Sequence, residues 1–290
     1  MPAPDSVVAG PSGEGRIARS WRLTRAAWEV VRGDRALLAL GAISVVAGAI
    51  GLALIFVLSG SFDNGHLSGE QILLFTLIFA YPLTFVSVFL NTAIAACAAA
   101  ALEGRRLSLG QALAVPMRRL GAVAVWALIA AVVGFVLEQL ASRLPFGGSI
   151  AARLVGLGWS LASLFAIPIL ALEDCSAPEA LRRSAGVVKK RWGESIGGNV
   201  IIGAWMALAV LAIVVLGVIG AAATNDVPAV RDAIIAVGVL ALVSVVALQL
   251  LVRQTFAVAL YRYATSGDAP GPFSAGDLQS PFGRKRRGQS

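Results

Sequence analysis

The stretch LEDCSAPEALRRSAGVVKKRW, Leu172 to Trp192, carries eight charged residues among its 21. The runs on either side of it, 154–172 and 195–223, carry no charge at all. Charge concentrated between two apolar runs is typical of a chain that leaves a membrane, turns along its surface and enters it again. This stretch therefore decides how the rest of the sequence is interpreted.

The composition of the whole chain agrees with that interpretation. Of the 290 residues, 58% are hydrophobic and only 14% are charged, against roughly 25% charged in ordinary soluble domains. A membrane span needs about 20 apolar residues, and six charge-free runs meet or approach that length: 36–59, 71–101, 120–137, 154–172, 195–223 and 233–252. None of them alternates as a barrel strand does. We expect an all-α polytopic membrane protein with six transmembrane helices, in a domain of residues 15–265.

The basic residues set the expected orientation. Of the 24 lysines and arginines, 21 lie in the N-terminal segment, the C-terminal tail and the two connections that share their side of the membrane. Only three lie in the connections on the other side. Because translocated loops disfavour Lys and Arg, we expect the basic side and both termini to be cytoplasmic, in a bacterial inner membrane.

The opening stretch itself predicts a surface helix. Ser176 and Glu179 form a capping-box pattern at its start, and an apolar face follows, made of Leu181, Ala185, Val188 and Trp192. Four cations fall mostly on the opposite face, namely Arg182, Arg183, Lys189 and Lys190. We expect an amphipathic cytoplasmic helix whose cations contact anionic lipid headgroups.

The same device recurs along the chain. Ser108 and Gln111 form a second capping-box pattern, and near the N-terminus a stripe is made by Ile17, Trp21, Thr24, Trp28 and Val31. Each such segment precedes an outward span, and the returning spans end in Ala-Leu-Glu at 101–103 and 171–173 and in Ala-Leu-Tyr at 259–261. The pattern indicates three repeats of a surface helix plus a helical hairpin, or the basic connections that any six-span protein needs. The sequence leaves both interpretations open.

Several short segments resemble a bacterial family of uncharacterised six-span membrane proteins, a domain of unknown function. They are GRIARSW at 15–21, FLNTA at 89–93, PEALRRS at 178–184, WGE at 192–194 and ALYRYAT at 259–265. Together they cover residues 15 to about 267. More distantly, the chain is similar to the membrane domain fused to some glycerophosphodiester phosphodiesterases, but it has no room for their catalytic barrel. The resemblance supports the topology and implies no known substrate.

Four polar residues in or beside the expected spans are candidate intramembrane site residues: Asn91, Gln249, Arg253 and Gln254. Asn91 either lines a substrate path or makes one interhelical hydrogen bond, which is the commoner role of a buried amide. Arg253 either lies in the hydrocarbon as part of a pathway or extends its side chain to the inner interface. No acidic residue falls inside the six runs to pair with it.

The remaining candidates favour no catalytic or metal chemistry. His66, the only histidine, has Asp63 and Ser68 nearby in one short loop, an ordinary grouping that does not define a hydrolase site. Cys97 and Cys175 lie in different surroundings, so free thiols are expected. No paired-cysteine motif, Walker loop or dinucleotide fingerprint occurs. We therefore expect no enzyme, no cofactor and no bound metal.

The two ends are expected to be disordered, over residues 1–14 and 266–290. The tail is rich in Gly, Pro and Ser and ends in a cationic cluster, Arg284, Lys285, Arg286 and Arg287, suited to anionic lipid. Nucleic acid is not the expected partner, because no aromatic stacking pattern accompanies this cluster.

Two functional hypotheses follow from these features. The first is a non-enzymatic membrane-organising or accessory protein whose basic cytoplasmic side engages lipids, a further copy of itself or a membrane partner. The alternative is a transporter of a small or lipid-like substrate. A transporter should have a polar cavity at mid-membrane that joins Asn91 to Arg253, whereas a tightly packed bundle favours the first hypothesis.

Overall fold

The computed structural model describes residues 16–61, 69–143, 155–192, 204–224 and 227–279, and this part of the chain is helical with short connections. The helices are α1 (Arg16–Gly33), α2 (Arg35–Ser61), α3 (Gly69–Leu102), α4 (Leu109–Arg118), α5 (Leu120–Arg143), α7 (Ala166–Leu172), α8 (Ala177–Trp192), α9 (Ala204–Ala223), α10 (Pro228–Ser266) and α11 (Ala275–Gln279). A further helical segment covers 155–162. The expected all-α class is therefore confirmed.

Within the part of the chain that the structure describes, five segments are long and apolar enough to cross a membrane: Arg35–Leu54, Tyr81–Leu102, Leu120–Ala141, Val155–Leu172 and Pro228–Ser266. They correspond to five of the six expected spans. α9 carries the apolar part of the remaining one, and residues 195–203 of that run lie outside the described residues.

Three of these segments differ clearly from the expected boundaries, and the first is α5, which passes the expected end at 137 and continues to Arg143. α10 does not end at Val252 but continues to Ser266, where Gly267 closes it in the left-handed conformation at φ 85°; nothing between these residues breaks a helix. The fourth span is interrupted by a turn at 163–165. Pro168 explains the turn, because a proline ring clashes with the carbonyl four residues earlier, that of Leu164.

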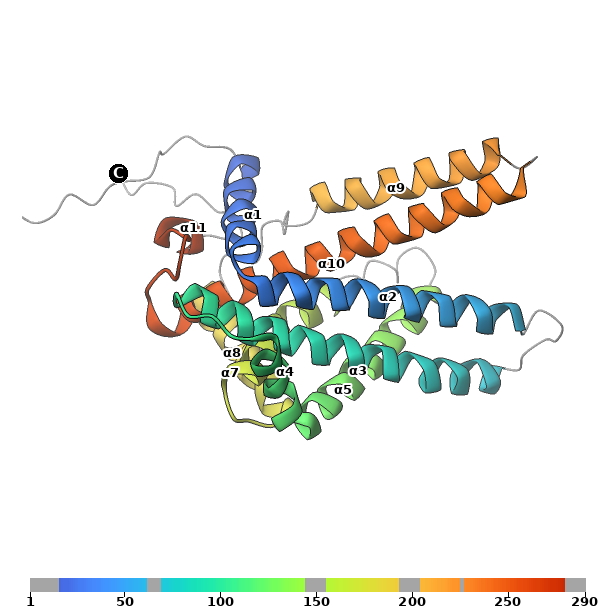
Figure 1. Ribbon diagram of the computed structural model, residues 1–290. Coiled ribbons are helices and arrows are strands. Elements are labelled where there is room, and N and C mark those ends of the chain that lie inside the picture. Colours follow the sequence, from blue (N-terminus) through green and yellow to red (C-terminus); the bar gives the residue numbers. More distant parts are fainter. Residues whose placement is uncertain (1–15, 62–68, 144–154, 193–203, 225–226, 280–290) are drawn as a thin grey trace, which may run out of the picture.

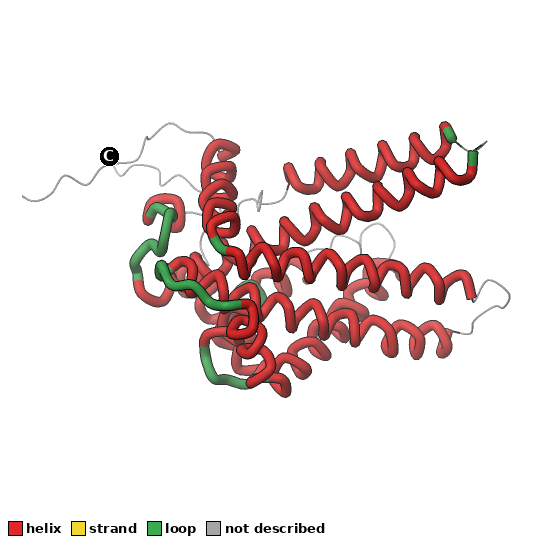
Figure 2. Tube along the Cα trace, viewed as in Figure 1, coloured by secondary structure: helices red, strands yellow, loops and turns green. Residues whose placement is uncertain are grey.

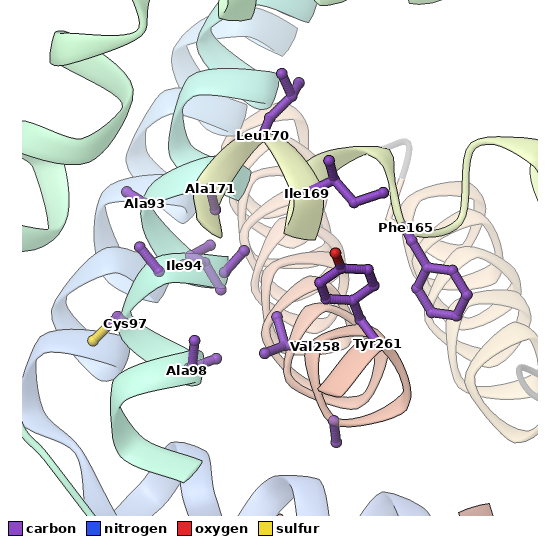
Figure 3. Close-up of a cluster of buried hydrophobic side chains, with 14 of the residues drawn as sticks. Ala93, Ile94, Cys97, Ala98, Phe165, Ile169, Leu170, Ala171, Val258 and Tyr261 are labelled. Carbon is purple, nitrogen blue, oxygen red and sulfur yellow. The ribbon is translucent and has the colours of Figure 1, made fainter. Parts of the chain in front are cut away.

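α3 is the central helix of the bundle. Of the residues in its apolar segment, 72% are buried, against 17% for α5. The residues between Ala93 and Ala100 are almost all alanine, and small side chains allow neighbouring helices to approach closely. Figure 3 shows α3 packed against α7 and α10, with the Tyr261 ring beside Ile169 and Phe165. α3, α7 and α10 thus supply much of the buried core.

α1 and α2 are separated by a sharp change of direction at Asp34. The Asp34 carboxylate Oδ1 accepts hydrogen bonds from the backbone N–H groups of Ala36 at 2.8 Å and Leu37 at 3.1 Å, which caps α2. The Cys97 thiol also donates to Oδ1, at 3.7 Å. In Figure 1, α1 lies across the end of α2 rather than in line with it. Asp34, buried to 4% exposure, therefore fixes α1 at an angle to α2.

The short helices and most of the loops that the structure describes gather at one end of the bundle (Figure 2). α1, α4 and α8 each precede a long apolar helix. The expected capping box of α4 is confirmed: Ser108 Oγ accepts from the Gln111 backbone N–H at 3.3 Å, and Gln111 Oε1 accepts from the Ser108 N–H at 2.9 Å. At the start of α8, the Glu179 carboxylate accepts instead from the Arg183 side chain.

The beginning of the expected disordered tail is folded. Residues 267–279, the C-terminal strap, return along α10 and end in α11, with Phe273 and Leu278 buried. The Phe273 ring lies 6.2 Å from that of Phe256 in α10. Gly271, at φ 59°, passes so close to α3 that an added Cβ would lie 3.0 Å from Leu102 Cδ2. Two apolar side chains and a close glycine thus dock this segment. The expected disordered regions 1–14 and 280–290 lie outside the described residues.

Candidate functional site

The ends of the three returning helices meet in a polar cluster. Each carries the recurring triplet, and the last residues of two triplets interact: the Tyr261 hydroxyl donates a hydrogen bond to Glu173 Oε1. Arg262, the next residue of α10, forms an ion pair with Glu103 at the end of α3. The sequence indicated these triplets as repeats but did not indicate that they contact one another.

Glu173 is the centre of this cluster. Its other carboxylate oxygen accepts a hydrogen bond from Arg183 of α8, and Arg183 also pairs with Glu179. The hydrogen bonds to the two carboxylates raise the pKa of Arg183 further above its already high value. Arg119, between α4 and α5, donates to the backbone carbonyls of Glu173 and, at 2.8 Å, of Leu170. The end of α7 is therefore tied to three other parts of the chain.

Cys175 lies in the loop between α7 and α8, half-buried. Burial is the main cause that raises the pKa of its thiol, and the negative charges of Glu173 and Glu179 act in the same direction, while the cation of Arg183 opposes them. A thiol with a raised pKa is a weak nucleophile at neutral pH. Around Cys175, Glu173, Glu179, Arg183 and Arg119 hold the loop in place by ion pairs and hydrogen bonds.

α8 is joined to the interrupted fourth span by a buried serine. The Phe165 backbone N–H donates to Ser184 Oγ at 2.9 Å, and Ser184 is fully buried. A backbone N–H displaced by the turn at 163–165 thus finds a partner on α8. Val188 is buried on the same side of α8, while the candidate cations Arg182, Arg183, Lys189 and Lys190 are exposed.

Two of the four candidate intramembrane residues interact directly. Gln254 Nε2 donates to Asn91 Oδ1 at 3.1 Å, joining α10 to α3, and the Asn91 amide nitrogen donates to the Ser87 carbonyl at 2.8 Å. Both amides are buried. Gln249 is half-buried and Arg253 is exposed, so the structure does not join either to this pair.

The structure has an apolar surface pocket away from these polar residues. It is formed between α9 and α10 by Ile213, Val214, Gly217, Ala221, Ile235, Gly238, Val239 and Leu242. None of the candidate polar residues lines it. Among the described residues, no three histidine, cysteine or acidic side chains lie close enough together to hold a metal ion.

The exposed face of α1 differs from the expected stripe. Its buried side is made by Leu23, Ala27 and Val31, whereas Trp21 and Trp28 are 63% and 37% exposed. Hydrophobic periodicity grouped the tryptophans with Val31 because it does not distinguish apolar side chains that contact protein from those that contact lipid. The remaining candidates, Asp63, His66 and Ser68 in the loop and Arg284, Lys285, Arg286 and Arg287 in the tail, lie outside the described residues.

The fold and its polar cluster are consistent with one class, an all-helical membrane protein with several long apolar helices. Within that class, the chain belongs to a family of unknown function, DUF6159, which matches residues 69–271. The matched region runs from the start of α3 to the middle of the C-terminal strap. The searches against curated proteins and against solved structures found no match.

Proposed function

We propose that the chain is a six-span protein of the bacterial cytoplasmic membrane with both termini inside. α9 supplies the span that the five long apolar segments leave out, since its 20 residues are charge-free. The positive-inside rule supports the orientation, because the short helices gather at one end of the bundle, and these helices and their connections carry most of the lysines and arginines. α1, α4 and α8 each introduce one hairpin in this arrangement, which supports the three-unit repeat.

The C-terminal strap supports a position for Arg253 at the inner boundary of the membrane. Phe273 of the strap contacts Phe256, only three residues beyond Arg253. The strap carries charged and backbone polar groups that need water. Phe256 therefore lies near the surface, and the exposed Arg253 side chain reaches the interface by extending over less than one helical turn.

The role that the geometry supports best is non-enzymatic: a membrane-organising or accessory protein whose cytoplasmic face binds anionic lipid headgroups. The observation that carries this proposal is the division of α8. Ser184 and Val188 hold it to the core, while Arg182, Lys189 and Lys190 are exposed beside the membrane boundary. Arg183 is different, because Glu173 and Glu179 engage it. Among the side chains of the helix that the structure describes, these three cations thus remain for lipid phosphates.

A transporter is the weaker alternative. It would use Asn91 and Arg253 in one polar path, but the amide of Asn91 bonds to Gln254 and to its own helix. This bond is of the kind that joins helices in a lipid environment, worth on the order of 1 kcal/mol. The likeness to the membrane domain of glycerophosphodiester phosphodiesterases stays a prediction, and no activity is carried over from it.

The orientation is tested with single cysteines in a background without Cys97 and Cys175. A cysteine at position 65 or 147 should react with an impermeant thiol reagent added to whole cells. A cysteine at position 186 should not; an added Cβ at Gly186 meets no atom within 4 Å, so α8 tolerates it. Labelling only at position 186 would show that the topology is inverted.

The lipid role is tested on the full chain in bilayers that contain spin-labelled lipids. We expect labelled phosphatidylglycerol to be immobilised by the protein more than labelled phosphatidylcholine, and added salt should weaken this preference. The α8 triple variant, Arg182→Gln with Lys189→Gln and Lys190→Gln, should reduce it. The matched control, Arg182→Lys with Lys189→Arg and Lys190→Arg, keeps the charges and should retain it. Equal immobilisation of both lipids by the wild type would contradict the proposal.

A further inference from the structure

The exposed side of α1 carries an unusual alternation of aromatic and cationic residues. Trp21, Arg25, Trp28 and Arg32 are all exposed and follow one another at spacings of four, three and four. At 3.6 residues per turn these positions lie on one face of the helix. We call this face the Trp–Arg stripe. It is the side opposite to Leu23, Ala27 and Val31, which are buried against the rest of the protein.

The direction of the stripe is fixed by the fold. The buried side of α1 is committed to the protein core, and Asp34 caps α2 immediately afterwards from a buried position. α1 lies across the end of α2 (Figure 1), so if α2 crosses the bilayer then α1 runs along its surface. α1 then lies at the level where apolar chains give way to headgroups, and the stripe is its side that is not buried against the protein.

The side chains of the stripe match the chemistry at that depth. Tryptophan is enriched at membrane interfaces, because its ring is largely apolar and its indole N–H needs a polar partner. The guanidinium groups of Arg25 and Arg32 present paired N–H donors that suit phosphate oxygens. The ion pair that Arg25 forms with Glu29, at 3.3 Å, joins side chains that are 72% and 41% exposed. An exposed pair of this kind is weak, so it does not prevent Arg25 from binding a phosphate.

We propose that the Trp–Arg stripe of α1 is a binding surface for the headgroups of anionic phospholipids, with the two indoles in the interface and the two guanidiniums on lipid phosphates. This inference rests on the proposed membrane topology and adds a second contact surface, separate from α8. The stripe also lies outside residues 69–271, the part of the chain that the family match covers. An acidic protein surface is the competing partner, and it would leave the indoles away from the acyl chains.

The experiment measures the emission of Trp21 and Trp28 in the full chain reconstituted into phosphatidylcholine bilayers. Their contribution is obtained by subtracting the emission of the double variant, Trp21→Phe with Trp28→Phe, from the emission of the wild type. Lipids with bromine near the top of the acyl chains quench indoles at the interface. Brominated phosphatidylglycerol should reach half-maximal quenching at a mole fraction about fivefold lower than brominated phosphatidylcholine, the enrichment that one cation near an anionic surface provides.

Substitutions then separate the stripe from other cations. Arg25→Gln with Arg32→Gln should bring the two half-quenching fractions to within about twofold of each other. Arg25→Lys with Arg32→Lys keeps the charges and should retain most of the difference. The α8 triple variant should leave it unchanged, so that the two lipid surfaces fail or succeed independently.

Three results would overturn the inference. If neither brominated lipid quenches the difference signal, the stripe does not face the bilayer. If both lipids quench at the same mole fraction in the wild type, the stripe enters the interface without recognising anionic headgroups. A loss of preference in the α8 triple variant equal to that in the Arg25 and Arg32 variant would assign the effect to overall charge. None of these three results decides whether the α8 triple variant changes the immobilisation of spin-labelled phosphatidylglycerol.

Discussion

Truncating Phe273 to alanine should release the C-terminal strap from the bundle. Phe273 is only 5% exposed, and its ring lies 6.2 Å from that of Phe256. Full burial of a phenylalanine side chain is worth about 1.5–3 kcal/mol, and a favourable ring pair adds about 0.5–1.5 kcal/mol. We take about 3 kcal/mol for Phe273→Ala, which corresponds to about two orders of magnitude in the equilibrium between the docked and the released strap.

Hydrogen exchange of the full chain measures this equilibrium directly. Backbone amides of residues 267–279 should exchange about 100-fold faster in Phe273→Ala than in the wild type, while those of α3 and α10 should keep their protection. Gly276→Ala is the matched control, because an added Cβ there meets no atom within 4 Å. Alanine favours the helix over glycine by up to about 1 kcal/mol, so this variant should slow exchange slightly. Unchanged exchange in Phe273→Ala would refute the view that this ring docks the strap.

Three further outcomes are expected. Gly41→Ala should be less stable in thermal unfolding than Gly134→Ala in α5 by about 1–3 kcal/mol. Both variants gain helix propensity, but only the Cβ added at Gly41 would lie 2.7 Å from a buried leucine methyl of α10, while the one at Gly134 meets nothing within 4 Å. Equal melting temperatures of the two variants would contradict this. Ser184→Ala removes the acceptor of the Phe165 N–H hydrogen bond and should cost about 1–3 kcal/mol, and proteolysis of α8 should accelerate. The rate of Cys175 alkylation should rise with pH and reach half its maximum above the ordinary thiol pKa of about 8.5. Burial raises the pKa of this thiol, so the reactive thiolate forms only at higher pH. A midpoint at or below that value would count against the burial of this loop.

The sequence predicted the long helices well, because charged residues bound the apolar runs on both sides. α2, α3 and α9 agree with the runs wherever the structure describes them, and the capping box at Ser108 places the start of α4. The expected span over 120–137 is longer in the structure, since α5 continues to Arg143. The same reason explains why α10 extends beyond the expected span 233–252. That span was ended before the charge of Arg253, although arginine is a good helix former.

Contacts between distant segments could not be derived in the same way. Asn91 and Gln254 were each singled out as polar residues near a span, but 163 positions separate them and nothing local indicates that they meet. The similar triplets that end at Glu103, Glu173 and Tyr261 were noticed and their repetition was left open, while their hydrogen bonds depend on how α3, α7 and α10 pack. The strap was missed for another reason: its glycines, prolines and serines indicated disorder, and two buried apolar side chains outweighed that composition.

The hydrogen bond between Asn91 and Gln254 also has a consequence during biosynthesis. Ribosomes add about 5–20 residues per second, so the 163 positions that separate the two amides correspond to about 8–33 seconds of translation. Throughout that interval Asn91 has been made while Gln254 has not. On the nascent helix Ser87 can accept from the Asn91 amide nitrogen, but the Asn91 Oδ1 needs another donor, such as water or a group of the insertion machinery, until the last hairpin arrives.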